Sequence, residues 1–474
     1  MEEFSDFSQF DDINPLISKF ESMLLRGENP FFDVEEYEEI IEHYIINNVE
    51  HAEKVVEHAL SQFPWSTSIL LKKAVVLSHR EEFKEAFDIV RMVKSIDVNN
   101  IELYITLSYI YRVQNKYEKS IAALQKALTF KEEVDEVFFD IAEDYSMLEN
   151  EEKEIEYLKK ALHHNPMHND AMDRLFWTFK SSGKNAESIE YFAEFVKQFP
   201  LRQMAWEKLG FSYYEMDLYE KSIEAFEYAL SIDEMVSCYT GLAQSYWKLG
   251  KLNLAIQALK ESLLAFPYAP NVNSLIGWIY LDLNDHTNAQ KHFLNEIYID
   301  SVSSNAWKGL AQVFIFNNDF DNAFDSLNRS FIMDEIDLGS IDQLINLSLK
   351  KDTSFDKTEE VLVRFTQLYP TNQMLWLKYS EFLFYFDLET KAIEVLENAL
   401  KIIENPALIY YRIAAMFYLK NDETMGHLNL IAAMNIDSKG VETIFEFSEK
   451  LYDYEPLVSL LNSLKTNNDT NENS

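Results

Sequence analysis

Residues 203–232 read QMAWEKLGFSYYEMDLYEKSIEAFEYALSI, and residues 236–265 read VSCYTGLAQSYWKLGKLNLAIQALKESLLA. Both stretches place a large aromatic residue and two small residues at the same intervals, as Trp206, Gly210 and Ser222 do in the first copy. The second copy begins 33 residues after the first. A unit of this length repeated in tandem indicates a solenoid, so we take a period near 34 residues as the basis for the rest of the chain.

Proline provides an independent check of this period, because it cannot continue a helix. Pro64, Pro166, Pro200, Pro267 and Pro370 each follow an apolar run, and they are separated by 102, 34, 67 and 103 residues. These spacings are three, one, two and three periods, with slips of one residue. The whole chain is therefore predicted to follow one rhythm.

Units of two helices can be laid down from residue 33 onward. They begin at residues 33, 67, 101, 135, 169, 203, 236, 270, 304, 339, 373, 407 and 441, the last one being degenerate. Positions 8 and 20 of most units hold Ala, Gly or Ser, which would let paired helices approach closely. Unit 339 departs from this rule, because it places Asn346 and Thr358 there.

This pattern resembles the tetratricopeptide repeat (TPR) family, which has a large residue at position 4, Leu at 7, a small residue at 8, Tyr at 11, Ala at 20, an aromatic at 24 and Ala at 27. Unit 203 carries it as Trp206, Leu209, Gly210, Tyr213, Ser222, Phe226 and Ala229. The resemblance covers about residues 33–465. It implies an all-α fold of the α-α superhelix class, a right-handed solenoid of antiparallel helix pairs in which each unit is stable only against its neighbours.

The regions outside the array are predicted from composition. Residues 1–32 form an acidic N-terminal segment in which residues 15–26 make a capping helix that covers the first repeat, or alternatively a segment that occupies a groove. Residues 466–474 contain no apolar side chain and are predicted to be disordered. A seam, where the stack bends or loosens, is predicted near residues 339–370.

The net charge and the cysteine content of the chain argue against some classes of partner and compartment. The chain has 80 acidic residues against 42 Lys and Arg, a formal net charge of −38, so it would repel a phosphate backbone and we expect no nucleic acid partner. No apolar run is long enough to cross a bilayer, and Cys238 is the only cysteine, so we expect a cytoplasmic protein without a disulfide.

No catalytic or cofactor motif is present in the sequence. The closest glycines, Gly241 and Gly250, are nine residues apart, which excludes GxGxxG, GxxxxGK and GxSxG loops. One local histidine cluster could hold a metal or could be a solvated turn: His163, His164 and His168. Because no cysteine lies near it, we favour the turn and predict no metal, no cofactor and no enzymatic activity.

Two segments are strongly acidic. Residues 1–40 and residues 131–156 each hold twelve acids against two bases. Such a run is either a solvated face or a docking patch for a basic partner.

In the TPR family the first helices line a concave groove, and positions 2, 5, 9, 12 and 13 point into it. The resemblance therefore implies a partner-binding groove formed by Tyr109, Phe139, Glu143, Trp177, Phe211, Tyr214, Trp247, Trp278, Lys308 and Gln312. Aromatic residues dominate this set, which suits a binding surface, although any one of them could instead pack between repeats.

The predicted function is a scaffold or adaptor that binds a peptide or helical segment of a partner protein. Some TPR co-chaperones clamp a carboxylate with basic residues from two repeats. Only Lys308 with Gln312 approaches the first half of that clamp, so an apolar or basic segment is the better candidate. The alternative is a self-assembly module that forms a homo-oligomer through residues 16–24 or through the last unit.

Overall fold

The computed structural model describes residues 15–26, 30–131, 134–331, 338–350 and 355–461. Within these ranges all regular secondary structure is helical. The predictions for residues 1–14 and for the tail at residues 466–474 lie outside the described residues. The chain divides into two compact units, Met1–Leu249 and Gly250–Ser474.

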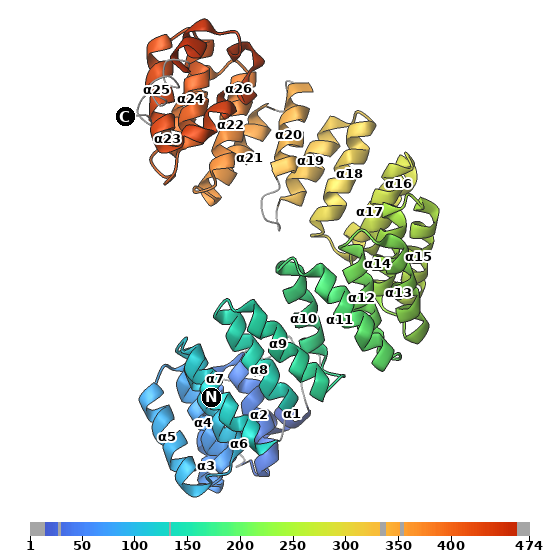
Figure 1. Cartoon of the computed structure of the whole chain (residues 1–474), viewed down its shortest axis with the longest axis vertical. Helices are drawn as coiled ribbons and strands as arrows, with labels where there is room; N and C mark the ends of the chain where they lie inside the picture. Colours follow the sequence, from blue (N-terminus) through green and yellow to red (C-terminus); the bar gives the residue numbers. More distant parts are fainter. Residues whose placement is uncertain (1–14, 27–29, 132–133, 332–337, 351–354, 462–474) are drawn as a thin grey trace. The chain divides into compact units, whose positions relative to one another are not determined.

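The N-terminal unit consists of helices that follow one another in antiparallel pairs (Figure 1). Its helices are α1 (Pro15–Leu25), α2 (Val34–Asn47), α3 (Val49–Gln62), α4 (Thr67–His79), α5 (Phe83–Ile96), α6 (Ile101–Val113), α7 (Tyr117–Ala127), α8 (Val134–Met147), α9 (Glu151–His164), α10 (Asn169–Ser181), α11 (Asn185–Gln198), α12 (Gln203–Tyr214), α13 (Tyr219–Ile232) and α14 (Val236–Lys248). The first helices α2, α4, α6, α8, α10 and α12 each pack against their own second helix. Contacts between successive first helices join α2 to α4, α4 to α6, α10 to α12 and α12 to α14.

The C-terminal unit continues the same alternation. Its helices are α15 (Leu252–Ala265), α16 (Val272–Asp282), α17 (His286–Ile299), α18 (Ser304–Phe316), α19 (Phe320–Ser330), α20 (Leu338–Lys350), α21 (Phe355–Leu368), α22 (Gln373–Tyr385), α23 (Glu389–Ala399), α24 (Ala407–Leu419), α25 (Glu423–Ile436) and α26 (Thr443–Phe447). The predicted degenerate unit has two short 3-10 helices beside α26, Ser438–Glu442 and Glu449–Leu451, followed by a helical stretch at residues 455–461.

The first helices begin within two residues of the predicted unit starts from unit 33 through unit 407. The fold class is all-α, built from stacked antiparallel helix pairs, and the prediction of this class is confirmed.

Phe226 shows why positions in neighbouring repeats must be small. Its ring is fully buried and lies against two helix backbones, those of α12 and α14. A Cβ atom added to Gly210 would lie 2.8 Å from the ring, and one added to Gly241 would lie 2.3 Å from it. The absence of these two side chains therefore creates the slot that the phenyl ring fills.

A left-handed residue closes the first helix of each regular pair. Among the described residues, position 15 of ten units has φ between 54° and 71°, at Glu81, Asn115, Glu149, Gly183, Asp217, Gly250, Asn284, Asn318, Asp387 and Asn421. The amide of Asn150 donates to the carbonyl oxygen of Tyr145 at 2.9 Å, and the amide of Glu149 donates to that of Ser146 at 2.9 Å. This is the Schellman arrangement, which satisfies the last carbonyl groups of a helix and turns the chain into the next one.

Replacing Glu149 by asparagine is expected to raise the free energy of unfolding by about 0.5–1 kcal/mol, because a longer side chain is strained at positive φ and asparagine is not. Glu149 is exposed, so the change removes no buried contact. Urea titration followed by circular dichroism measures the effect. Glu152→Asn, at an exposed helical position, is the control and should give no gain.

α1 packs on α2. Ile17 and Phe20 are buried in one cluster with Phe32, and the hydroxyl of Tyr44 donates to Oε1 of Glu21 at 2.7 Å. The apolar face of α1 is thus used within the core of the N-terminal unit.

The pair α20 and α21 differs in detail from the sequence-based alignment. Asn346, assigned to the small position 8, is exposed, whereas Ser348 is buried and its hydroxyl is hydrogen-bonded to that of Thr358. In this pair the residue that meets position 20 is therefore Ser348, at position 10, and not the residue at position 8.

The seam remains a prediction. Amide protons of α20 and α21 are expected to exchange faster than those of α22 and α23, because position 20 of this pair holds the hydroxyl of Thr358 where α23 holds Ala392. Hydrogen exchange read by mass spectrometry tests this. Equal protection of the four helices would contradict the seam.

Candidate partner-binding face

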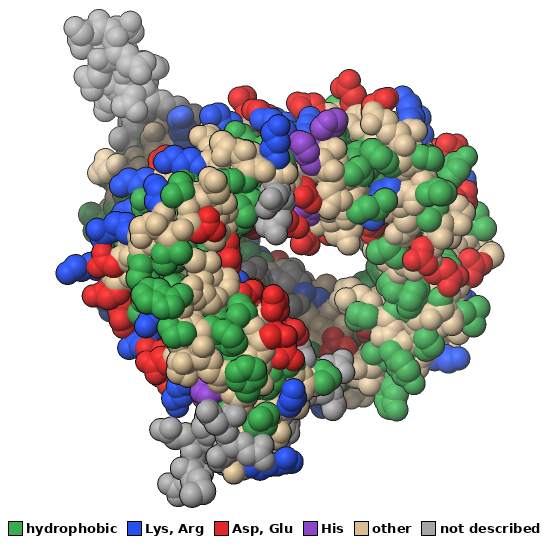
Figure 2. Space-filling model, turned by 90° about the horizontal axis from the view of Figure 1, so that it is seen from below, with side chains coloured by type: hydrophobic (Ala, Val, Ile, Leu, Met, Phe, Trp, Pro, Cys, Tyr) green, Lys and Arg blue, Asp and Glu red, His purple; other side chains and the backbone are tan. Residues whose placement is uncertain are grey.

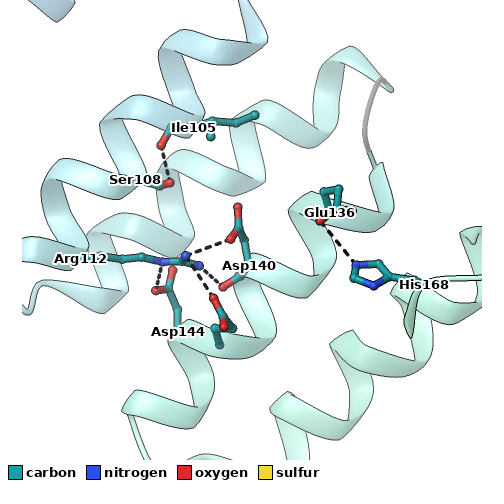
Figure 3. A network of polar contacts seen from close by, with 8 residues as sticks. Ile105, Ser108, Arg112, Glu136, Asp140, Asp144 and His168 are labelled. Carbon is teal, nitrogen blue, oxygen red and sulfur yellow. Dashed lines mark hydrogen bonds and ion pairs between the residues drawn. The ribbon is translucent and has the colours of Figure 1, made fainter. Parts of the chain in front are cut away.

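The first helices α6, α8, α10 and α12 of the N-terminal unit carry most of the predicted site residues. We call the surface formed by their exposed and half-buried side chains the first-helix face. Ion pairs connect these helices. Nε of Arg112 on α6 lies 2.7 Å from Oδ1 of Asp144 on α8, and its Nη1 lies 2.9 Å from Oδ1 of Asp140 and 3.4 Å from Oε2 of Glu143. Figure 3 shows the guanidinium group of Arg112 reaching from its helix into this group of acids.

The acids of this cluster outnumber the base. Three carboxylates share one guanidinium group, and Asp144 is only 1% exposed. Burial raises the pKa of Asp144 and of Glu143, although Arg112 lowers both. The cluster therefore has uncompensated negative character, which favours cations nearby.

Trp177 on α10 is the most exposed of the predicted aromatic site residues on this face. Its side chain is 57% exposed, although the neighbouring Phe176 is buried. The ammonium group of Lys180 lies over the indole ring, 5.1 Å from its centroid, and 2.8 Å from Oε1 of Glu215, the residue that follows α12. An aromatic surface, a cation and a carboxylate thus meet in one accessible place.

The aromatic residues beside Trp177 form a packed floor. The ring centroid of Phe211 lies 6.1 Å from that of Phe176 and 4.9 Å from that of Phe226, and Tyr214 contacts Tyr219 edge to face at 5.5 Å. Because these rings are held by neighbours, the surface around Trp177 is rigid.

The remaining predicted site residues of the N-terminal unit mostly have partners within the protein. The hydroxyl of Tyr109 lies 2.6 Å from Nε2 of His79, within hydrogen-bond distance, and the ring of Phe139 lies 5.0 Å from that of His168. Trp247 is half-buried. These residues contribute to packing between repeats as well as to the surface.

The other three predicted site residues, Trp278, Lys308 and Gln312, belong to the C-terminal unit and are all half-buried. Nε1 of Trp278 donates to Oδ1 of Asn305 at 3.0 Å. Glu143, Trp177, Phe211 and Tyr214 lie on α8, α10 and α12 of the N-terminal unit, so the predicted site residues are divided between the two units.

Asp140 and Asp144 were not among the site residues predicted from the sequence. They lie in the acidic run at residues 131–156, which was interpreted as either a solvated face or a docking patch. The structure shows that part of this run pairs with Arg112 of the preceding repeat. A base in one unit facing acids at positions 6 and 10 of the next was the signal available in the sequence.

The histidine cluster has structural contacts. His168 caps α10 by accepting a hydrogen bond from the amide of Ala171, and its Nε2 lies 3.5 Å from Glu136 (Figure 3). His163 and His164 are exposed. Among the described residues, no group of three or more His, Cys, Asp or Glu side chains is arranged to hold a metal ion. Burial raises the pKa of the Cys238 thiol to about 12, so this cysteine is a packing residue.

The surface of the protein carries charged and hydrophobic side chains side by side. Figure 2 shows hydrophobic, acidic and basic side chains interspersed over the face that it presents. None of the described helices is long and apolar enough to cross a membrane.

Comparison with models of protein families shows to which family the repeats belong. A family model of the tetratricopeptide repeat matches residues 174–234 and 240–301, and a second model of this repeat matches residues 101–133. These parts of the chain are tetratricopeptide repeats. The matched parts of this TPR protein include Trp177, Lys180 and Glu215.

Solved structures similar to this TPR protein include the human IFIT1 dimer with m7Gppp-AAAA, which has 14% identity and a TM-score of 0.38 and covers 82% of this chain and 94% of that chain. The APC/C hetero-tetramer Cut9-Hcn1 has 10% identity and a TM-score of 0.34, with 91% and 92% covered. Pseudomonas aeruginosa PilF has 16% identity and a TM-score of 0.37, with 45% and 96% covered. With TM-scores below 0.5, these likenesses say nothing about partners. No curated protein matches the TPR protein by sequence.

Proposed function

We propose that this TPR protein is a non-enzymatic scaffold that binds a peptide or helical segment of a partner protein along the first-helix face. The exposure of Trp177 carries the proposal, because an indole ring that is mostly in water beside a rigid aromatic floor gains most from being covered. The acids around Arg112 favour a segment that is apolar or basic. A chain with a single cysteine suits a reducing compartment, and we place its action in the cytoplasm.

The alternative of self-assembly through residues 16–24 has less support. Ile17 and Phe20 are buried within the chain itself and are therefore not available for a second copy. The first-helix face, in contrast, keeps Trp177 accessible.

Replacing Trp177 by alanine is expected to weaken partner binding about tenfold or more, the effect of losing a central aromatic anchor of about 1.4 kcal/mol or more. The partner is first isolated with the full chain as bait and identified by mass spectrometry. Its affinity for purified wild-type and variant chains is then measured by calorimetry.

Trp65→Ala is the matched control. Trp65 is 75% exposed, but it lies in the turn between α3 and α4, away from the first-helix face. Equal affinities of wild type and Trp177→Ala, or an equal loss with Trp65→Ala, would contradict binding along this face.

A further inference from the structure

We infer that Trp177 and Glu215 form a receptor for an arginine side chain of the partner, and that Lys180 fills this receptor in the free protein. This inference rests on the proposed function and names the chemistry of the occupant. The ammonium group of Lys180 lies over the indole ring and next to the carboxylate of Glu215. A ring face and a carboxylate side by side are the two features that bind a cationic side chain.

Lys208 makes a similar contact with a neighbouring aromatic ring, but that contact is buried and only stabilises the fold. Lys208 lies 5.7 Å from the ring centroid of Phe176 and pairs with Asp173 at 2.5 Å and with Glu207 at 3.2 Å. Its side chain is only 9% exposed, and Phe176 is buried. This arrangement is closed, so no external cation can replace Lys208.

The arrangement at Trp177 is open. The side chain of Lys180 is 37% exposed and that of Glu215 is 26% exposed. Lys180 can therefore rotate into water at little cost, since a solvated lysine loses only a weak surface ion pair. A partner's cation would then take its place over the ring.

Charge favours a cation as the occupant. On α8 the three carboxylates of Asp140, Glu143 and Asp144 pair with Arg112, and Glu143 is also within reach of the charge of Arg174. An acidic segment would be repelled here, whereas a basic one would be attracted. Arginine fits better than lysine, because its planar guanidinium group can stack on an indole ring and still donate two hydrogen bonds to a carboxylate.

The test uses the full chain and fluorescence anisotropy. The probe is a fluorescein-labelled dodecapeptide with four arginines separated by glycine and serine. Two matched probes carry citrulline or leucine in place of arginine. We expect the arginine probe to bind, the citrulline probe to bind about tenfold more weakly or not at all, and salt to weaken only the arginine probe.

Single substitutions test the roles of Trp177, Glu215 and Lys180 separately. Trp177→Ala and Glu215→Gln are each expected to weaken binding of the arginine probe about tenfold. Lys180→Met is expected to strengthen binding about threefold to tenfold, because it removes the internal competitor. Lys197→Met is the control, since it changes the net charge equally and removes an exposed lysine paired with Glu194 on α11.

The outcomes are distinct. If Lys180→Met weakens binding of the arginine probe or leaves it unchanged, the role of Lys180 is overturned. The same holds if Lys180→Met and Lys197→Met strengthen binding of this probe equally. Equal binding of the arginine and citrulline probes overturns recognition of a cation. Binding of the leucine probe alone, lost in Trp177→Ala, would leave the proposed function standing while this inference fails. If Trp177→Ala proves misfolded by circular dichroism, Lys180→Met still decides the question.

Discussion

Replacing Phe226 by alanine is expected to lower the free energy of unfolding of the N-terminal unit by about 3–5 kcal/mol, the cost of removing a fully buried phenyl ring. The ring has no exposed surface and fills a slot between two glycine-bearing helices. Gly210 and Gly241 have no side chains that could move into the space, so the cavity would remain. The edge-to-face contact with Phe211 at 4.9 Å would also be lost.

Urea unfolding of the full chain followed by circular dichroism measures the effect, and hydrogen exchange localises it to α12, α13 and α14. Tyr228→Ala is the control on the same helix, since Tyr228 is 58% exposed and stacks on Trp206 at the surface. It is expected to cost less than about 1 kcal/mol. If Phe226→Ala costs no more than Tyr228→Ala, the slot does not stabilise the stack.

Replacing Gly309 by alanine is expected to destabilise the C-terminal unit by about 1–3 kcal/mol, because the new methyl group overpacks the core. A Cβ atom on Gly309 would lie 2.1 Å from Cζ of Phe293. Phe293 is itself fully buried and faces Gly277 on its other side, where a Cβ atom would lie 2.6 Å from the ring. The ring therefore has no room to retreat. In an open helix the same substitution would stabilise by about 1 kcal/mol, so the sign of the effect is diagnostic.

A second substitution tests the cause of that loss. Phe293→Leu shortens the side chain and is expected to cost less in the Gly309→Ala background than in wild type, so the two changes should not be additive. Gly440→Ala is the control for Gly309→Ala, because a Cβ atom there would come no closer than 3.1 Å to its nearest neighbours, Asp437 and Tyr411. Thermal melting of the four chains gives the coupling. Additive effects, or stabilisation by Gly309→Ala, would show that the helices can separate without cost.

The helix pairs could be predicted from sequence because their packing is local. Most units repeat their small residues at fixed positions, and each regular first helix is followed by a left-handed residue at position 15. At unit 339 this approach assigned Asn346 to the helix interface, whereas the structure places Ser348 there. Which side of a helix faces its neighbour does not follow from the spacing of small residues alone, so this difference could not be seen without the neighbouring helix.

The candidate site was harder to predict than the fold. Trp177 and Phe211 occupy the same position of successive repeats, but Trp177 is mostly exposed and Phe211 is packed against Phe176 and Phe226. Periodicity places both on the same side of their helices. The difference depends on the size of the neighbouring side chains in the next repeat, which the position within a unit does not specify.

The sequence by itself determined the period, the alternation of helices and the class of fold, because a helix pair is defined by contacts within about 34 residues of chain. Only the tertiary structure decided which aromatic residues are covered, which acids share Arg112 and how Lys180 meets Trp177 and Glu215. The physical reason is that burial and ion pairing depend on distances between repeats, and those distances are set by side chains that belong to a different unit of the sequence.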